Sequence, residues 1–405
     1  MIFAVTCCVV PLVALFDEWT PKVTPFGIQI FVGSFVFGIG MQIANTCASG
    51  CMVFLGKIFH TVLPIMVGAG FMGGAVMGWY RRPGWERISG WTTAPEKKGY
   101  GSSPVRPADG IWWQEGVCIQ FCLVIGIWFV FYMIEKNAHG KDSVLNERVP
   151  PLPKINQGKG TTWTDKVFFH VHPWWVGGLG VSIGTGLVFL FNKAVWGVAF
   201  PFALVGSKIL YQIGSEDSGL YRVAKWDMWT KPKFANMLKN QELYNNGNVM
   251  VNCGLILGAM VAYFLTQRYE KPITSKFMHR PVTMLGAFLG GGMMGYGALI
   301  AYGCNIGGYF STATSLSMGS WLWLAGGLAG SYFGVKLRPF FGLKNETCQM
   351  NKGAKWIPIE TEAEVEQVFV NEIVGVEEVV VETSLNEKEI ELPPVNEAED
   401  SIIEE

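Results

Sequence analysis

The chain has 405 residues, of which 50% are hydrophobic and only 16% are charged, and its formal net charge is −1. With a mean hydropathy of +0.29, 50 glycines and 16 tryptophans, this composition is typical of a multi-span membrane protein and excludes an ordinary soluble domain. The 9 cysteines form no C-x-x-C pair and no Cys/His cluster at zinc spacing, and the basic residues are scattered. The sequence therefore predicts no metal site, no cofactor and no binding to nucleic acid.

Apolar segments of span length recur along the chain and predict an all-α polytopic membrane protein with about 8–9 transmembrane helices in a lipid bilayer. The segment 196–213, which contains Pro201 and Lys208, fits either a ninth span or a re-entrant segment. Loop Lys and Arg residues divide evenly between the two sides, so they do not give the orientation. The other expected spans are 2–16, 26–44, 61–79, 112–134, 173–191, 249–266, 281–302 and 321–337.

Charge separates the end of the chain from the rest. From Glu346 onward there are 17 acidic and 3 basic residues, and no apolar run reaches span length. We therefore expect 344–405 to be an acidic, mostly disordered tail. The remainder is basic, which favours an anion as ligand, although loop cations that only set membrane topology explain the charge equally well.

Two glycine-rich segments repeat one pattern. Residues 38–50 (GIGMQIANTCASG) and 295–307 (GYGALIAYGCNIG) both read G-x-G-x-x-I-A-x-x-C-x-x-G, and their cysteines, Cys47 and Cys304, stand 257 residues apart. One copy alone fits a packing helix with an inert cysteine. Two copies in register, with further glycines matched at the same offset, favour an internal duplication with one thiol in each half.

Each copy predicts an apolar helix that ends at a cysteine in a turn of small residues. Half-helices that begin at Ala48 and Asn305 would direct backbone N–H groups at an anion, and Ser49 and Asn305 add side-chain donors. The candidate substrate pathway therefore consists of Cys47, Ser49, Gly50, Gly303, Cys304, Asn305 and Gly307.

The duplicated motif and the H-P-W-W at 172–175 resemble the YeeE/YedE-type sulfur-transport membrane family over roughly residues 1–343. The resemblance implies a permease of the cell (inner) membrane that carries thiosulfate or a related small sulfur-containing anion. It also implies two inverted repeat halves with short re-entrant half-helices, and a small soluble sulfur-carrier protein as partner. The corresponding divisions are a first half (1–110), a linker helix with a polar loop (111–171), a second half (172–343) and the tail (344–405).

Members of that family usually begin with one more helix, which ends in an Arg-Phe-Cys-type motif with a third cysteine. The sequence starts after that position, so a longer natural chain and a member that lacks the helix both fit. Cys51, Cys118 and Cys122 are the thiols that would take the place of the third cysteine. Cys118 and Cys122 share a helix face at i, i+4, where small packing residues are the competing explanation.

Thiosulfate has one soft terminal sulfur and hard oxygens, whereas sulfate has oxygens only. A row of neutral, polarizable thiols would match the soft sulfur, and a thiolate would repel a dianion. A membrane-bound sulfur-relay enzyme with persulfide on Cys47 or Cys304 is the alternative. Neither motif contains a His, Asp or Glu to act as base, which favours transport. An assembly subunit that acts through the acidic tail is a third possibility.

Overall fold

A computed structural model describes residues 2–15, 22–24, 26–57, 62–86, 113–139, 174–213, 222–266 and 281–343. Within these ranges the secondary structure is helical, without a β-strand. The predicted tail and most of the two polar loops, at 81–110 and 135–171, lie outside the described residues. Five helical stretches are long and apolar enough to cross a membrane, namely Ile28–Gly56, Val62–Tyr80, Glu115–Ile134, Gly247–Phe264 and Pro281–Ala313.

The longer helices follow the apolar segments of the sequence. The segment 196–213 forms a helix from Ala199, with Pro201 in its first turn, where proline is tolerated. In chain order these helices are α1 (Ile2–Leu15), α2 (Ile28–Ile43), α3 (Ala48–Lys57), α4 (Val62–Glu86), α5 (Trp113–His139), α7 (Trp174–Asn192), α8 (Ala199–Ile213), α11 (Gly247–Thr266), α12 (Pro281–Ile300) and α14 (Gly319–Leu337). The short helices are η5 (Val223–Lys225), α9 (Asp227–Thr230), α10 (Pro232–Lys239), η6 (Leu243–Asn245), η8 (Asn305–Phe310), α13 (Ser311–Ala313) and η9 (Arg338–Phe341).

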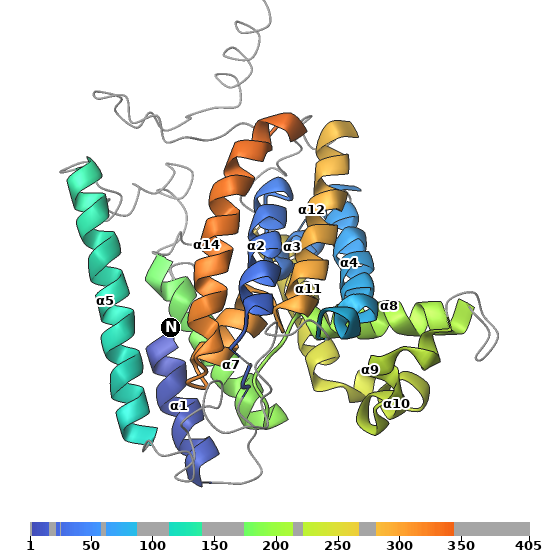
Figure 1. Ribbon diagram of the computed structural model, residues 1–405, viewed down its shortest axis with the longest axis horizontal. Coiled ribbons are helices and arrows are strands. Elements are labelled where there is room, and N and C mark those ends of the chain that lie inside the picture. Colours follow the sequence, from blue (N-terminus) through green and yellow to red (C-terminus); the bar gives the residue numbers. More distant parts are fainter. Residues whose placement is uncertain are drawn as a thin grey trace, which may run out of the picture. The chain divides into compact units, whose positions relative to one another are not determined.

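Helices α2, α4, α12 and α14 form a central bundle (Figure 1). Glycines let the backbones of α2 and α12 meet: a Cβ added at Gly40 would lie 2.6 Å from the Gly290 carbonyl oxygen, and one added at Gly33 would lie 2.8 Å from that of Gly297. Rising residue numbers on α2 therefore meet falling numbers on α12, so the two helices run antiparallel. Close backbone approach of this kind is the usual way in which membrane helices associate.

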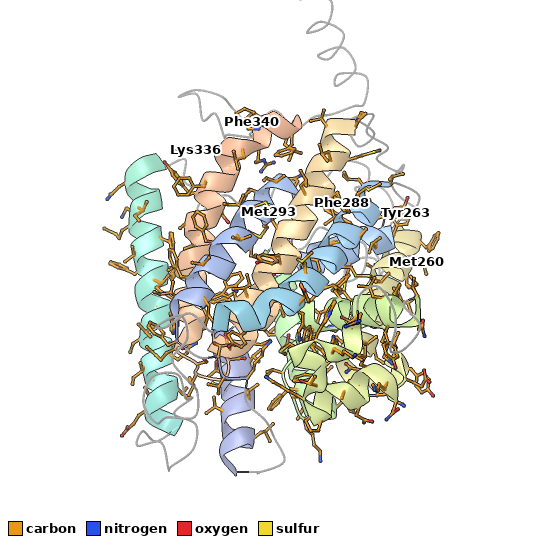
Figure 2. All side chains as sticks on the ribbon, turned by 45° about the vertical axis from the view of Figure 1, so that its right-hand side comes forward. Met260, Tyr263, Phe288, Met293, Lys336 and Phe340 are labelled. Carbon is orange, nitrogen blue, oxygen red and sulfur yellow. The ribbon has the colours of Figure 1, made fainter. Side chains whose placement is uncertain are left out.

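The outside of the bundle is apolar. Figure 2 shows side chains such as Phe288 and Phe340 on this surface, where they are 45% and 76% exposed. Helix α5 stands at one edge beside α1 (Figure 1), and a buried Gln120 fastens it by donating to the Ala313 carbonyl oxygen at 3.1 Å. An apolar exterior with polar groups turned inward suits a lipid surrounding.

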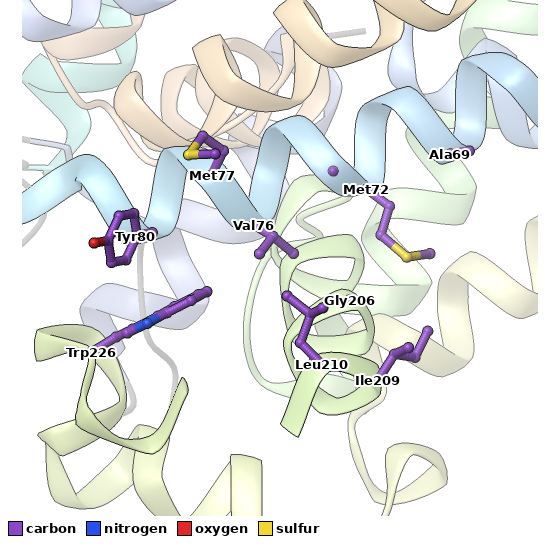
Figure 3. Close-up of a pocket in the computed structure, with 10 residues that line it drawn as sticks. Ala69, Met72, Val76, Met77, Tyr80, Gly206, Ile209, Leu210 and Trp226 are labelled. Carbon is purple, nitrogen blue, oxygen red and sulfur yellow. The ribbon is translucent and has the colours of Figure 1, made fainter. Parts of the chain in front are cut away.

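A cavity of about 600 Å³ lies between α4 and α8 (Figure 3). Its walls are aliphatic apart from Tyr80 and Trp226, whose rings meet at 5.0 Å at one end. The lining residues are Ala69, Met72, Gly73, Val76, Met77, Tyr80, Gly206, Ile209, Leu210 and Trp226. These side chains carry no charge, so this cavity does not suit an anion.

Candidate functional site

Two turns in the bundle are similar in backbone conformation. Helix α2 ends before Cys47 and α3 begins at Ala48, and α12 ends before Cys304 and η8 begins at Asn305. Two residues before each cysteine the backbone enters the left-handed region, with φ 53° at Asn45 and 61° at Tyr302. That conformation is costly for a non-glycine residue, above all for a large one such as tyrosine. Since the same costly conformation occurs before both cysteines, the surrounding structure must hold both turns in place.

Each cysteine caps the helix that follows it. The Gly50 backbone N–H donates to the Cys47 Sγ at 3.3 Å, and the Gly307 N–H donates to the Cys304 Sγ at 3.5 Å. Sulfur here takes the place that a Ser or Asp oxygen usually has at a helix N-terminus. Both thiols therefore lie where the positive end of a half-helix dipole and its free N–H groups converge.

The two thiols differ in exposure. Cys304 has 0% of its surface exposed, whereas Cys47 is partly exposed and has the Ser49 Oγ at 3.3 Å. Cys51, one helical turn after Cys47, is buried, and its thiol donates to the Pro64 carbonyl oxygen at 3.7 Å. Each repeat thus places one thiol at the start of a half-helix.

Gly303 makes the second turn possible. Its φ is +157°, and an added Cβ would lie 2.4 Å from the Gly308 backbone nitrogen. The carbonyl oxygen of Gly303 accepts a hydrogen bond of 3.0 Å from the Trp323 Nε1 of α14. The Trp323 ring in turn stacks on Tyr309 at 6.2 Å. No side chain other than that of glycine fits this position, so the turn has little freedom.

Buried hydroxyl groups fix the chain after the second turn. The Ser311 hydroxyl donates to the Trp196 carbonyl oxygen at 2.7 Å, and the Ser317 hydroxyl accepts from the Thr24 backbone N–H at 3.2 Å. Ser315 accepts from the Lys22 N–H at 3.1 Å. The segment before α2 is therefore held against the loop that follows Cys304, which brings Lys22 to the site.

A cavity of about 190 Å³ adjoins the Cys304 turn, with Lys22, Tyr302, Gly303 and Gly307 in its wall. Sequence reasoning placed Lys22 in a short turn and did not select it. A lone cation between two apolar segments was the available signal. Arg338 was also missed: its Nη2 donates to the Asn45 Oδ1 at 2.9 Å, beside the Cys47 turn.

Of the other residues selected from the sequence, Asn305 lies at the Cys304 turn, whereas Cys118 and Cys122 lie on α5. Asn305 lies at the start of η8 with its Oδ1 buried and without a hydrogen-bond partner. Cys118 and Cys122 are exposed on α5, which Figure 1 shows apart from α12, so the structure does not bring them to Cys47 and Cys304. Among the residues that the structure describes, no three His, Cys, Asp or Glu side chains cluster as a metal site.

Comparison with known proteins places this arrangement in a family. A family model for sulphur transport matches residues 1–333. The thiosulfate transporter TsuA of Spirochaeta thermophila is 25% identical over 299 residues, which cover 72% of each chain. The probable transporter YedE of Escherichia coli is 27% identical over 89 residues, or 22% of each chain. The chain therefore belongs to the sulphur transport family and is an integral membrane transporter rather than an enzyme.

Proposed function

We propose that the chain is an inner-membrane permease for thiosulfate or a related small sulfur-containing anion, and that Cys47 and Cys304 meet the soft sulfur at a central constriction. The observation that carries this proposal is the pair of thiols, each of which caps a half-helix at the equivalent place of its repeat. The relative TsuA, named as a thiosulfate transporter, supports the choice of anion.

The residues of the two turns suit passage of an anion without a covalent step. The terminal sulfur would pass from one thiol to the next through weak S–H contacts and dispersion between polarizable atoms. Backbone N–H groups at Gly50 and Gly307, which donate to the cysteine sulfurs, would be shared with the oxygens. Ser49 and Asn305 would supply further donors. The family match gives no support to a persulfide relay on Cys47 or Cys304, since it assigns the chain to transporters.

An inverted repeat is part of the proposal. The elements α2, α3 and α4 recur as α12, η8 with α13, and α14 at the offset of 257 residues between the cysteines. Gly33 meets Gly297 and Gly40 meets Gly290, which is the reciprocal pattern that a two-fold axis requires. We propose halves at 1–110 and 172–343, joined by 111–171, with about 8–9 transmembrane helices in all. We further propose that a small soluble sulfur-carrier protein receives the anion inside the cell.

Uptake of radiolabelled thiosulfate into proteoliposomes tests the function. The wild type should take up thiosulfate, and excess sulfate should compete poorly because it has no soft sulfur. Cys304→Ala should lose at least about tenfold in kcat/KM, since removal of a thiol contact worth on the order of 1.4 kcal/mol has that effect. Cys253→Ala, which removes an exposed thiol of α11, is the matched control and should transport normally.

Two outcomes would contradict the proposal. Normal thiosulfate uptake by folded Cys304→Ala and Cys47→Ala proteins would show that the thiols do not read the substrate. Equal inhibition of wild-type uptake by sulfate and by unlabelled thiosulfate would show that the site selects charge and size without regard to sulfur.

A further inference from the structure

Lys22 lies in a small cavity beside the Cys304 turn. The cavity, of about 190 Å³, is enclosed by the end of α4, the start of α8, α9 and α10, and the end of α12. A volume of this size leaves room for a small ion with some of its hydration water. Among the described residues that line it, Lys22 is the only charged side chain, and aromatic residues such as Trp79 and Phe234 make up much of the wall.

The Lys22 ammonium lies close to the backbone at Gly307. A Cβ added at Gly307 would lie 3.0 Å from the Lys22 Nζ, and one added at Gly197 would lie 3.4 Å from it. The Gly307 N–H is the same group that donates to the Cys304 Sγ. An ammonium, a backbone N–H and a thiol therefore converge within one turn of chain, and two glycines leave the ammonium room to approach.

No carboxylate of the described residues forms an ion pair with this ammonium. The titratable groups that the described elements bring to it are Cys304 and Tyr302. Burial lowers the pKa of Lys22 to about 8, and Cys304 opposes part of this fall. The ammonium is thus still protonated at neutral pH. A cation that is half-buried and has no acidic partner is unfavourable, and in membrane proteins it commonly marks a binding site or pathway.

The position of Lys22 is built into the fold. Its backbone N–H donates to the Ser315 Oγ at 3.1 Å, and two residues later the Thr24 N–H donates to the Ser317 Oγ at 3.2 Å. Each of these bonds joins residues 293 positions apart. The side chain remains partly exposed even so, because it faces the cavity.

From this geometry we propose that Lys22 forms an anion-binding station that precedes the thiols. It would hold the oxygens of a small sulfur oxyanion, whose soft sulfur points to Cys304. This inference deepens the proposed function and rests on it for the identity of the anion. In this proposal Lys22 recognises the negative charge of the anion, and Cys304 recognises its soft sulfur. The apolar aromatic wall strengthens the attraction, because it lowers the local dielectric constant.

The test compares binding with transport in the full-length protein. Binding of thiosulfate and of sulfate to detergent-solubilised protein is measured by titration calorimetry at pH 7 and constant ionic strength. Uptake of thiosulfate is measured in proteoliposomes. Lys22→Gln removes the charge, Lys22→Arg keeps it, and Lys225→Gln removes an exposed charge of η5 outside the cavity. Melting temperatures show whether each variant is folded.

Lys22→Gln should raise the Kd for both anions, and the KM for thiosulfate, by at least about tenfold. Lys22→Arg should recover part of that loss, and Lys225→Gln should match the wild type. Cys304→Ala should instead weaken thiosulfate more than sulfate. Loss of both anions to the same degree in Cys304→Ala would contradict the division of roles.

Failure of this inference is distinguishable from failure of the permease proposal. If the wild type takes up thiosulfate and folded Lys22→Gln binds and transports it equally well, the Lys22 station is wrong and the permease stands. If the wild type binds thiosulfate without uptake and Lys22→Gln abolishes binding, the station stands and the permease falls. If folded wild-type protein neither binds nor transports, both are wrong.

Discussion

The Cys47 turn and the Cys304 turn are alike in backbone and unlike in surroundings. In both turns a residue with positive φ stands two positions before the cysteine. In both, the cysteine sulfur accepts a hydrogen bond from the backbone N–H three residues later. The Cys47 turn leads into a ten-residue α-helix and its cysteine is partly exposed, whereas the Cys304 turn leads into a six-residue π-helix and its cysteine is buried. The shared pattern builds the turn, and the neighbouring elements decide how tightly it is held.

Each turn also has its own cation. Lys22 reaches the Cys304 turn from the segment before α2, and Arg338 reaches the Cys47 turn from the end of α14. Neither comes from the repeated motif itself. If the proposed pathway is correct, the Cys304 side would be its narrow, selective part and the Cys47 side its more open part.

The largest expected effect comes from exchanging the residues that precede the two cysteines. Gly303→Thr, which copies Thr46 of the first turn, would force a side chain into the Gly308 backbone at φ +157°. We expect destabilisation of about 3 kcal/mol or more and loss of uptake. Thr46→Gly should cost far less, since Thr46 is partly exposed. Melting temperatures in detergent would check this, and equal effects of the two changes would contradict the asymmetry.

A second pair of equivalent positions should also respond differently. A Cβ at Gly330 of α14 would lie 2.0 Å from the Phe35 carbonyl oxygen, whereas one at Gly73 of α4 would meet no atom within 4 Å. Gly330→Ala should therefore separate α14 from α2 at a cost of about 1–3 kcal/mol. Gly73→Ala should be neutral or slightly stabilising, because it removes freedom from the unfolded chain. Thermal unfolding of the two variants measures the contrast, and a neutral Gly330→Ala would show that this helix contact is loose.

The sequence predicted the features that depend on a local pattern of residues, such as the two repeated turns. The offset between Cys47 and Cys304 indicated equivalent turns, and half-helices do begin at Ala48 and Asn305. The site itself depends on contacts that no local pattern contains. Lys22 is brought to the Cys304 turn by hydrogen bonds to a loop almost 300 residues away, so a reading of the short turn before α2 gave it no weight.

Cys118 and Cys122 were selected from their spacing, but the structure places them away from the site. The i, i+4 spacing of Cys118 and Cys122 predicted a shared face but not the direction in which that face points. The structure fastens α5 through Gln120 instead and leaves both thiols exposed. In a membrane protein, apolar residues face lipid and core alike, so hydropathy does not separate the two.

The pH dependence of uptake should follow the charge on Lys22. Its pKa of about 8 in the folded protein means that the ammonium is present below pH 8 and is lost above it. Uptake should therefore fall above about pH 8. The contribution of Lys22 to stability should rise with pH between about 8 and its ordinary value near 10.5, since the unfolded chain binds more protons there. Lys22→Arg should remove the fall in uptake. A fall that persists in Lys22→Arg would assign the titration to another group.

The smallest effect is expected at Arg338. Its guanidinium donates to the Asn45 Oδ1 at 2.9 Å and to the Gln42 Oε1 at 3.5 Å, and its Nε is buried without a partner. Arg338→Gln should loosen the Cys47 turn at a cost of about 1 kcal/mol, because one of these bonds is long and Asn45 is exposed. The change should show most clearly as faster alkylation of Cys47 by N-ethylmaleimide in detergent, followed by mass spectrometry. The exposed Cys253 should react at an unchanged rate. If Cys47 also reacts at its wild-type rate, Arg338 does not restrain the first turn.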